Sequence, residues 1–246
     1  MELTAPEPAE PALSASAPYR RPAPGTHPLP DSPEYVATRL RHPKQPLILV
    51  PHTLSEITGP VFGPGRVGPL DHDLTRQYDA EPLGERIIVE GRVVDEDGRP
   101  VPNTLLEVWQ ANAAGRYAHK NDIHGAPLDP NFSGAGRALT DGAGRYRIVT
   151  IKPGAYPWPN HPNAWRPAHI HFSLLGRSFV SRLVTQMYFP GDPLLAFDPI
   201  FNSVPGDRAR QRLIASFDRT VTTAGWALGY HFDVVLRGRE STPMVG

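Results

Sequence analysis

The pattern of apolar and polar positions predicts a series of short β-strands that begins near Gly84. The segment 86–95 (RIIVEGRVVD) is rich in β-branched residues and ends at a turn over 96–98, which is typical of a strand. Strands separated by Gly/Pro turns, with no alternation of strands and helices, predict a mainly β protein built as an antiparallel β-sandwich. Further strands are expected at 104–110, 145–151, 168–174, 180–189 and 230–236, and one short helix at 207–217.

The chain before these strands is rich in proline. Residues 1–30 contain eight prolines among many alanines and serines, with too few large apolar groups to fold alone. More prolines interrupt residues 31–80, so we expect a long irregular N-terminal arm that packs on the sandwich or on a partner subunit. The predicted division is a tail at 1–30, an arm at 31–80, a sandwich domain at 81–239 and a C-terminal tail at 240–246.

Charge and composition exclude several classes of function. The 246 residues include 25 basic and 25 acidic side chains, and no Lys/Arg run is long enough to indicate a nucleic-acid partner. Cysteine is absent, which excludes disulfides, zinc knuckles, iron–sulfur clusters and thiol nucleophiles. No apolar run reaches the length of a membrane helix, and the N-terminus lacks the features of a secretory signal. We therefore expect a cytoplasmic protein with no membrane partner.

The strongest candidate for chemistry is the segment 166–172 (RPAHIHF). Side chains alternate between the two faces of a strand, so His169 and His171 are expected on one face and the apolar residues on the other. With the apolar face in the core, the two imidazoles would lie side by side and could coordinate one metal ion. Taken alone, the pair is also typical of the polar half of an amphipathic strand. Arg166 beside it and the rigid loop 153–158 (PGAYPW) favour the functional interpretation.

The histidines alone leave the metal open, because imidazole suits Zn, Cu, Fe and Ni. The HExxH pattern of zinc hydrolases is absent, and no Asp or Glu stands near the pair as an obvious third ligand. Tyrosine phenolate is a hard anionic donor, and its ordinary pKa of about 10 means that only a strongly Lewis-acidic cation ionises it at neutral pH. Two phenolates and one hydroxide would balance the charge of a buried ferric ion, which favours Fe(III).

Three segments resemble the intradiol ring-cleaving dioxygenases: 108–117 (VWQANAAGRY), 153–158 (PGAYPW) and 165–172 (WRPAHIHF). The likeness extends from roughly Tyr35 to Gly238 and is strongest to the branch of the family that acts on protocatechuate. It implies a transthyretin- or immunoglobulin-like β-sandwich as the catalytic domain.

The resemblance also implies a set of site residues. One non-haem Fe(3+) per chain would be bound by Tyr117 and His171 as equatorial ligands and by Tyr156 and His169 as axial ligands. Arg166 would lie beside the reacting ring, and it and Tyr156 are the implied catalytic residues. The implied substrate-binding residues are Tyr35, Trp158, Gln186 and Ile200.

The activity implied by the resemblance is cleavage of protocatechuate (3,4-dihydroxybenzoate) with O2 to 3-carboxy-cis,cis-muconate, a step of aromatic catabolism in the β-ketoadipate pathway. The catecholic substrate would bind the iron as a dianion, and the departing hydroxide and Tyr156 would accept its two protons. Arg166 would stabilise negative charge that develops on the ring. The implied partner is a homologous α subunit that lacks the metal ligands, in a hetero-oligomer.

Two alternatives stay open. Catechol and hydroxyquinol 1,2-dioxygenases belong to the same family, but they have a helical N-terminal segment, which the proline-interrupted residues 1–80 do not predict. The stretches 91–102 and 140–154 also resemble transthyretin-type modules, which bind without catalysis. Such a module would need no paired tyrosines and histidines, so iron content would separate it from an enzyme.

Overall fold

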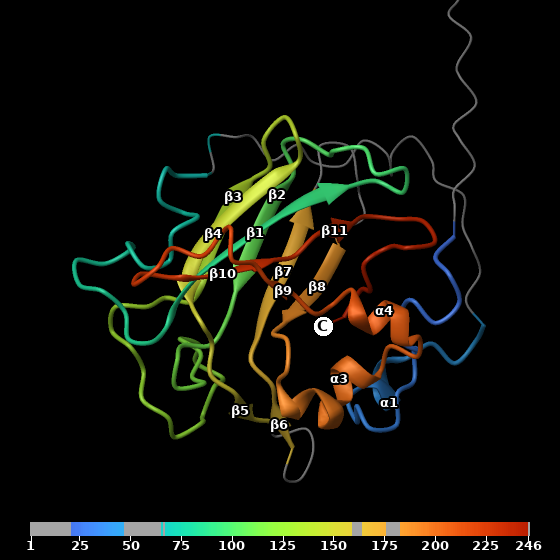
Figure 1. The fold of residues 1–246 in the computed structure, drawn as a ribbon. Coiled ribbons are helices and arrows are strands. Elements are labelled where there is room, and N and C mark those ends of the chain that lie inside the picture. The colour runs from blue at the N-terminus through green and yellow to red at the C-terminus, as the bar shows by residue number, and fades with distance from the viewer. Residues whose placement is uncertain (1–20, 47–64, 66, 159–163, 176–182, 246) are drawn as a thin grey trace, which may run out of the picture.

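The computed structural model describes residues 21–46, 65, 67–158, 164–175 and 183–245. Two β-sheets packed face to face form the centre of the fold, which confirms the mainly β sandwich (Figure 1). The first sheet contains β1 (Arg86–Val94), β4 (Arg145–Ile151), β9 (Ser216–Phe217), β10 (Leu228–His231) and β11 (Val234–Val235). The second has the order β3 (Ala135–Leu139), β2 (Leu105–Trp109), β7 (His169–Leu175) and β8 (Leu183–Tyr188). A separate pair consists of β5 (Tyr156–Pro157) and β6 (Trp165–Arg166).

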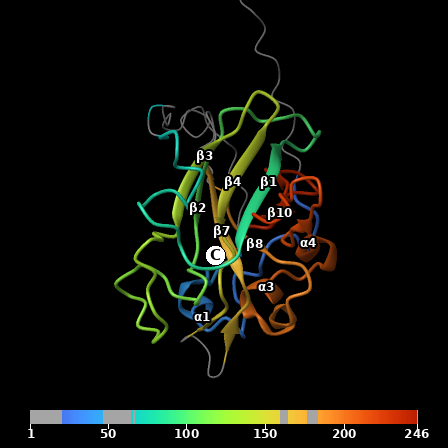
Figure 2. The same ribbon diagram turned by 60° about the vertical axis from the view of Figure 1, so that its left-hand side comes forward.

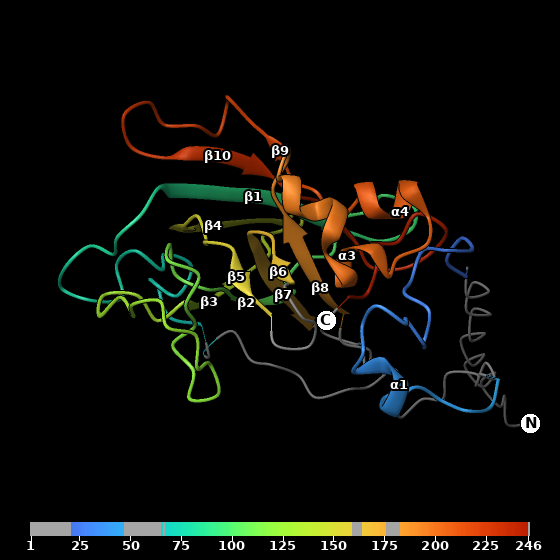
Figure 3. The same cartoon turned by 90° about the horizontal axis from the view of Figure 1, so that it is seen from below.

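The core lies between the two layers, which Figure 3 shows one above the other. Alternate side chains of each sheet enter it, because only one face of each strand points inward. Val89 of β1, Leu106 of β2 and Phe172 of β7 are all fully buried there. The outer face of β1 is also covered, because Ile88 packs with Val149 and neighbouring loop residues. The outer face of β1 is thus covered at Ile88, while Glu90 and Arg92 on the same face are polar.

The first sheet is mixed rather than wholly antiparallel. Strand β1 pairs in parallel with β10 and β11, while its pairing with β4 is antiparallel, as are all pairings of the second sheet. The strand expected at 230–236 is split in two. At the break, the Asp233 carboxylate accepts the Arg92 backbone N–H at 2.7 Å. A side chain thus replaces one main-chain partner of the ladder.

One strand and one helix differ from the prediction. Strand β3 was not expected, because its sequence AGRAL has weak strand propensity. The helix expected at 207–217 ends after five residues, as α4 (Asp207–Gln211). The chain then joins the edge of β8, where Tyr188 bonds to the backbone of Leu213 at 2.8 Å and of Ala215 at 2.9 Å. These bonds to β8 are incompatible with continued helix.

Three further short helical turns were not expected: α1 (Thr38–Arg41), the 3-10 turn η2 (Pro193–Phe197) and α3 (Pro199–Asn202). Figures 1 and 2 both show α3 and α4 together on the side of the sandwich next to β8. Asp192 caps η2 and Asp198 caps α3, each with a proline at the start of the turn. No helix in the described ranges has the length and apolarity that crossing a membrane would need.

The described part of the N-terminal region, residues 21–46, lies against the sandwich. Ala23 bonds to Arg239 at 3.2 Å, and the Gly25 carbonyl accepts the Gly206 N–H at 3.0 Å. Residues 240–245 also pack on the fold, because Val245 is buried and its N–H bonds to Val184 at 3.1 Å. The division into a tail, an arm, a sandwich and a second tail stays a prediction, since residues 1–20 and 47–64 lie outside the described ranges.

Candidate active site

Strand β7 separates the core from the site, as its alternation predicts. Ile170, Phe172 and Leu174 are each at most 2% exposed and belong to the core. His169 and His171 point to the opposite face, with their ring centroids 4.9 Å apart. The predicted side-by-side arrangement of the two imidazoles is confirmed.

The ring of His169 is fixed by a main-chain contact. Its Nδ1 donates to the Pro167 carbonyl at 2.7 Å, and its Nε2 lies 3.4 Å from the hydroxyl of Tyr156. Burial lowers the pKa of His169 well below its ordinary value, with the positive charge of Arg166 as the next cause. The ring is therefore neutral, and with its proton on Nδ1 the lone pair belongs to Nε2.

The ring of His171 is stacked on Trp109, which is opposite it in the pairing of β2 and β7. The two ring centroids are 4.6 Å apart and the planes differ by 5°. Burial, followed by the charge of Arg166, lowers the pKa of His171 to about 3. This imidazole is also neutral at physiological pH and can act as a metal ligand.

The two tyrosines come from loops that touch each other. Tyr117 ends a turn in which the Asn112 side chain accepts two backbone N–H groups, and its own N–H bonds to Asp122 at 2.8 Å. At Gly115, with φ of +78°, an added Cβ would clash with the Ala155 carbonyl oxygen, so glycine permits the close approach of the two loops. The rings of Tyr117 and Tyr156 consequently meet edge to face, with centroids 5.4 Å apart.

The chemistry of these donors fits a hard, highly charged cation. Burial is the main cause that raises the pKa of Tyr117 and of Tyr156, and the opposing charge of Arg166 does not reverse it, so both phenols stay protonated unless a further positive charge is present. The Tyr117 hydroxyl and Nδ1 of His171 are buried and have no hydrogen-bond partner among the described residues. An unsatisfied buried polar group costs about 1–3 kcal/mol, which a bound cation would offset. No cluster of three His, Asp or Glu side chains that could bind a metal occurs in the described ranges.

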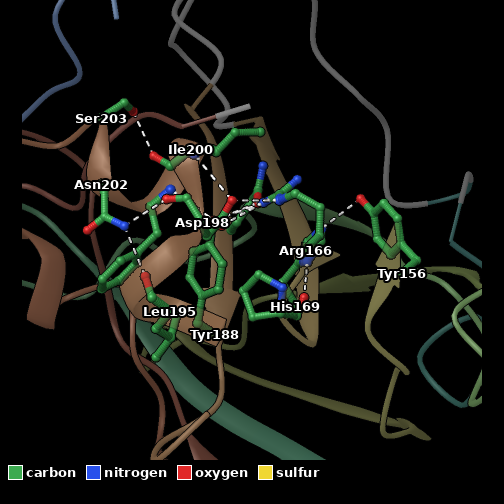
Figure 4. Close-up of polar contacts among 12 residues, drawn as sticks. Tyr156, Arg166, His169, Tyr188, Leu195, Asp198, Ile200, Asn202 and Ser203 are labelled. Atoms are coloured by element: carbon green, nitrogen blue, oxygen red, sulfur yellow. Dashed lines mark hydrogen bonds and ion pairs between the residues drawn. The ribbon is translucent and has the colours of Figure 1, made fainter. Parts of the chain in front are cut away.

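Arg166 is 2% exposed and has a dense set of acceptors (Figure 4). Its Nε and Nη2 donate to the two oxygens of Asp198 at 2.9 and 3.1 Å. Nη2 also donates to Gln186 at 2.6 Å and to the Tyr188 hydroxyl at 3.1 Å. Burial acts to lower the pKa of Arg166, but Tyr188 and Asp198 act against it and the net direction is upward. The guanidinium is therefore a permanent buried charge.

A cavity of about 810 Å³ opens at this place and is of the size that small-molecule sites have. Tyr117, Tyr156, Trp158 and His171 line it. The other predicted substrate-binding residues lie behind this wall: Tyr35 and Ile200 pack with Trp158 in one apolar cluster. The ring centroids of Tyr35 and Trp158 are 5.2 Å apart.

Gln186, also predicted to bind substrate, contacts Arg166 and does not line the cavity. Neither Arg166 nor His169 is part of the lining, although Cζ of Arg166 is 5.8 Å from the ring of Trp158. The structure thus brings the four predicted metal ligands together and sets Arg166 one layer behind the cavity surface.

Three residues of the site were not found by sequence reasoning. Trp109 was not among the predicted site residues, but it lines the cavity. Period-two alternation would have shown this, because Val108 is buried in the core and its neighbour must point the other way. Asp198 and Tyr188 had no local signal for a role at Arg166, since their contacts span 32 and 22 positions of the chain.

Comparison of the sequence with known protein families shows the class of protein to which this β-sandwich and its tyrosine–histidine site belong. The profile of a family described as dioxygenase matches residues 57–238. That of a family described as protocatechuate 3,4-dioxygenase β subunit N-terminal matches residues 19–53. The first match covers well over half of the sequence, so the chain belongs to the dioxygenase family.

Individual relatives narrow the comparison. The protocatechuate 3,4-dioxygenase β chain of Burkholderia cepacia is 63% identical over 89% of this chain and 94% of its own length. The protocatechuate 3,4-dioxygenase α chain of Pseudomonas putida is 32% identical over 80% of this chain and 97% of its own. Among solved structures, the 3-chlorocatechol 1,2-dioxygenase of Rhodococcus opacus 1CP superimposes with a TM-score of 0.53 at 29% identity, covering 74% of this chain and 71% of that one.

Proposed function

We propose that this chain is the iron-binding subunit of an intradiol dioxygenase that cleaves protocatechuate with O2 to 3-carboxy-cis,cis-muconate. The proposal rests on two phenols and one neutral imidazole that line the same cavity, with the second neutral imidazole, that of His169, 3.4 Å from the Tyr156 hydroxyl. The substrate follows from the 63% identity to a protocatechuate 3,4-dioxygenase β chain. Catechol-type relatives are less similar over less of the chain, so they define the competing substrates for a test.

The proposed ligands of one Fe(3+) per chain are Tyr117, Tyr156, His169 and His171. Their charges suit this ion, because two phenolates offset most of its charge and two neutral imidazoles add none. When bound, ferric iron would ionise the phenols and the catechol oxygens and draw electron density from the substrate ring. Iron in this family is non-haem, and no residue here supplies a thiolate, since cysteine is absent.

Four residues of the chain have proposed roles in proton transfer, charge stabilisation, ligand orientation and substrate binding. Oη of Tyr156 would accept a proton from a substrate hydroxyl, and the nearby charge of Arg166 acts to lower the pKa of this phenol against the larger effect of burial. Arg166 would stabilise negative charge on the ring, a preorganised electrostatic effect of about 2.7–4 kcal/mol per donor in comparable sites. Trp109 would orient His171, and Trp158 would provide an apolar wall for the aromatic ring.

We further propose that a homologous α chain completes the enzyme as a hetero-oligomer. Relatives named as α and as β chains both match this sequence. Leu40 and Phe197 are 93% and 77% exposed and would supply apolar surface for contact. The chain produced alone should then be poorly soluble or inactive until an α chain is added. A homo-oligomer with full activity would contradict this pairing.

The test is O2 uptake by the chain coexpressed with its α homologue, with protocatechuate, catechol and hydroxyquinol compared at equal concentration. We expect bound iron, a visible phenolate-to-iron absorption band and fastest uptake with protocatechuate. The Tyr117→Phe variant should lose or shift the band, whereas Tyr78→Phe, at an exposed tyrosine, should not. An iron-free, colourless and active preparation would refute the metal site. Faster uptake with catechol would refute the substrate assignment.

A further inference from the structure

Asp198 is a completely buried carboxylate that connects Arg166 to helix α3. Its exposed fraction is 0%, and that of Arg166 is 2%. Oδ1 accepts Nε of Arg166 at 2.9 Å and Oδ2 accepts Nη2 at 3.1 Å, so the contact is a two-point fork (Figure 4). Because two parallel hydrogen bonds fix the plane of a guanidinium as well as its position, this contact restrains the orientation of Arg166.

The same carboxylate begins the helix. Oδ1 accepts the N–H of Ile200 at 3.2 Å, and Oδ2 accepts the N–H of Phe201 at 3.4 Å. Ile200 is buried in the apolar cluster that includes Trp158, which lines the cavity. Asp198 therefore bonds both to the guanidinium and to the helix whose residue Ile200 packs in the cluster with Trp158.

The other acceptors of Arg166 lie on the strand beside the histidines. Gln186 and Tyr188 belong to β8, where they pair with His171 and His169 respectively. The Tyr188 hydroxyl also donates to Gln186 at 2.9 Å, so the two acceptors support each other. Arg166 is thus held between the start of α3 on one side and strand β8 on the other.

We propose that Asp198 is a positioning residue for the ring-cleavage reaction. It keeps the buried charge of Arg166 paired and fixes the guanidinium at the orientation that stabilises the reacting ring. The inference rests on the proposed function, because it assigns a purpose to Arg166 in that reaction. A purely structural role for Asp198 is the competing explanation, since the residue also caps α3.

Substitution by asparagine separates the two roles. Asparagine caps a helix about as well as aspartate does, but it is neutral and has one acceptor oxygen, so it cannot form the fork with Arg166. If capping were the whole role, Asp198→Asn would lower the thermal midpoint through the loss of one bond to α3 and would leave kcat close to wild type. If positioning is the role, the variant should keep its iron and visible band, and kcat should fall by about 10-fold or more with a smaller change in KM. Asp198→Glu, which restores the charge, should recover part of the lost kcat.

The matched control is Asn202→Ala. The Asn202 side chain holds the same turn through the carbonyls of Leu195, Ala196 and Asp198, at 2.9–3.2 Å, but does not touch Arg166. This variant should lower thermal stability while kcat remains close to wild type. An equal loss of kcat in Asn202→Ala would show that the helix matters rather than the carboxylate, and would overturn the proposal.

A double-mutant cycle covers the case in which Asp198→Asn folds poorly, because a neutral partner leaves the Arg166 charge buried alone. All variants are assayed as the complete complex with the α homologue. The double variant Arg166→Gln/Asp198→Asn should have nearly the same kcat as Arg166→Gln alone. Its thermal midpoint should be higher than that of Asp198→Asn alone, because no buried charge is left without a partner. Independent, multiplying losses in kcat would overturn the proposal. Absence of O2 uptake in the wild-type complex would instead refute the proposed function.

Discussion

Replacing Trp109 by alanine removes the parallel stack on His171 and should weaken iron binding without unfolding the protein. The indole and imidazole planes differ by 5° with centroids 4.6 Å apart. An aromatic pair of this kind contributes about 0.5–1.5 kcal/mol beyond its buried area. If all of that free energy is lost from the orientation of His171, the Kd for iron should rise by about 2- to 13-fold.

The assay is competition for iron with a chelator, followed by the visible phenolate-to-iron band at equilibrium. Trp109→Phe keeps a ring at this place and should recover most of the affinity. Trp226→Ala is a matched control, because Trp226 is 44% exposed and its ring contact is with Arg86 rather than with a histidine. An unchanged affinity in Trp109→Ala, or an equal loss in Trp226→Ala, would refute the assigned role of the stack.

Three further outcomes are expected. Phe172→Ala should lower the free energy of unfolding, measured by chemical denaturation, by about 3–5 kcal/mol, because this ring is fully buried. Phe217→Ala should lower it much less, because the Phe217 ring is 49% exposed. Burial raises the pKa of Tyr146 well above its ordinary value. The contribution of the neutral phenol to stability is therefore fully present below a pH of about 10 and falls as the pH rises through the folded-state pKa. The Tyr146→Phe variant should consequently lose less stability above a pH of about 10 than the wild type does. Removal of iron by a chelator should lower the thermal midpoint, because a ligand at 100 times its Kd stabilises the folded state by about 2.7 kcal/mol; equal midpoints with and without iron would contradict a site in the folded protein.

The two imidazoles were predictable because strand alternation is a local rule. It needs only the identity of successive residues, and it placed His169 and His171 opposite the core residue Phe172. The same rule applied to β2 would have placed Trp109 at the site. The neighbouring Val108 occupies the inward face of that strand, so Trp109 must point the other way.

Gln186 and Asp198 show where local rules end. The resemblance pointed to Gln186 as a substrate contact, and in the structure its side-chain oxygen accepts Nη2 of Arg166 at 2.6 Å, a contact that no local pattern indicated. The Asp198-Pro199 pair is a recognisable start of a helical turn, yet nothing local links it to an arginine 32 positions away. Contacts of this range depend on how β8 and α3 pack, which short sequence patterns do not encode.

The bond from His169 to the Pro167 carbonyl also bears on how freely this site can evolve. The acceptor is a main-chain atom, so no single exchange of a side chain at the acceptor position deletes it. Most point mutations would therefore leave the tautomer of His169 unchanged. The orientation of His171, in contrast, depends on the side chain of Trp109 and would change if that residue were replaced. Lineages that diversify the cavity are expected to vary around the stacked histidine first and to leave the backbone-held one unchanged.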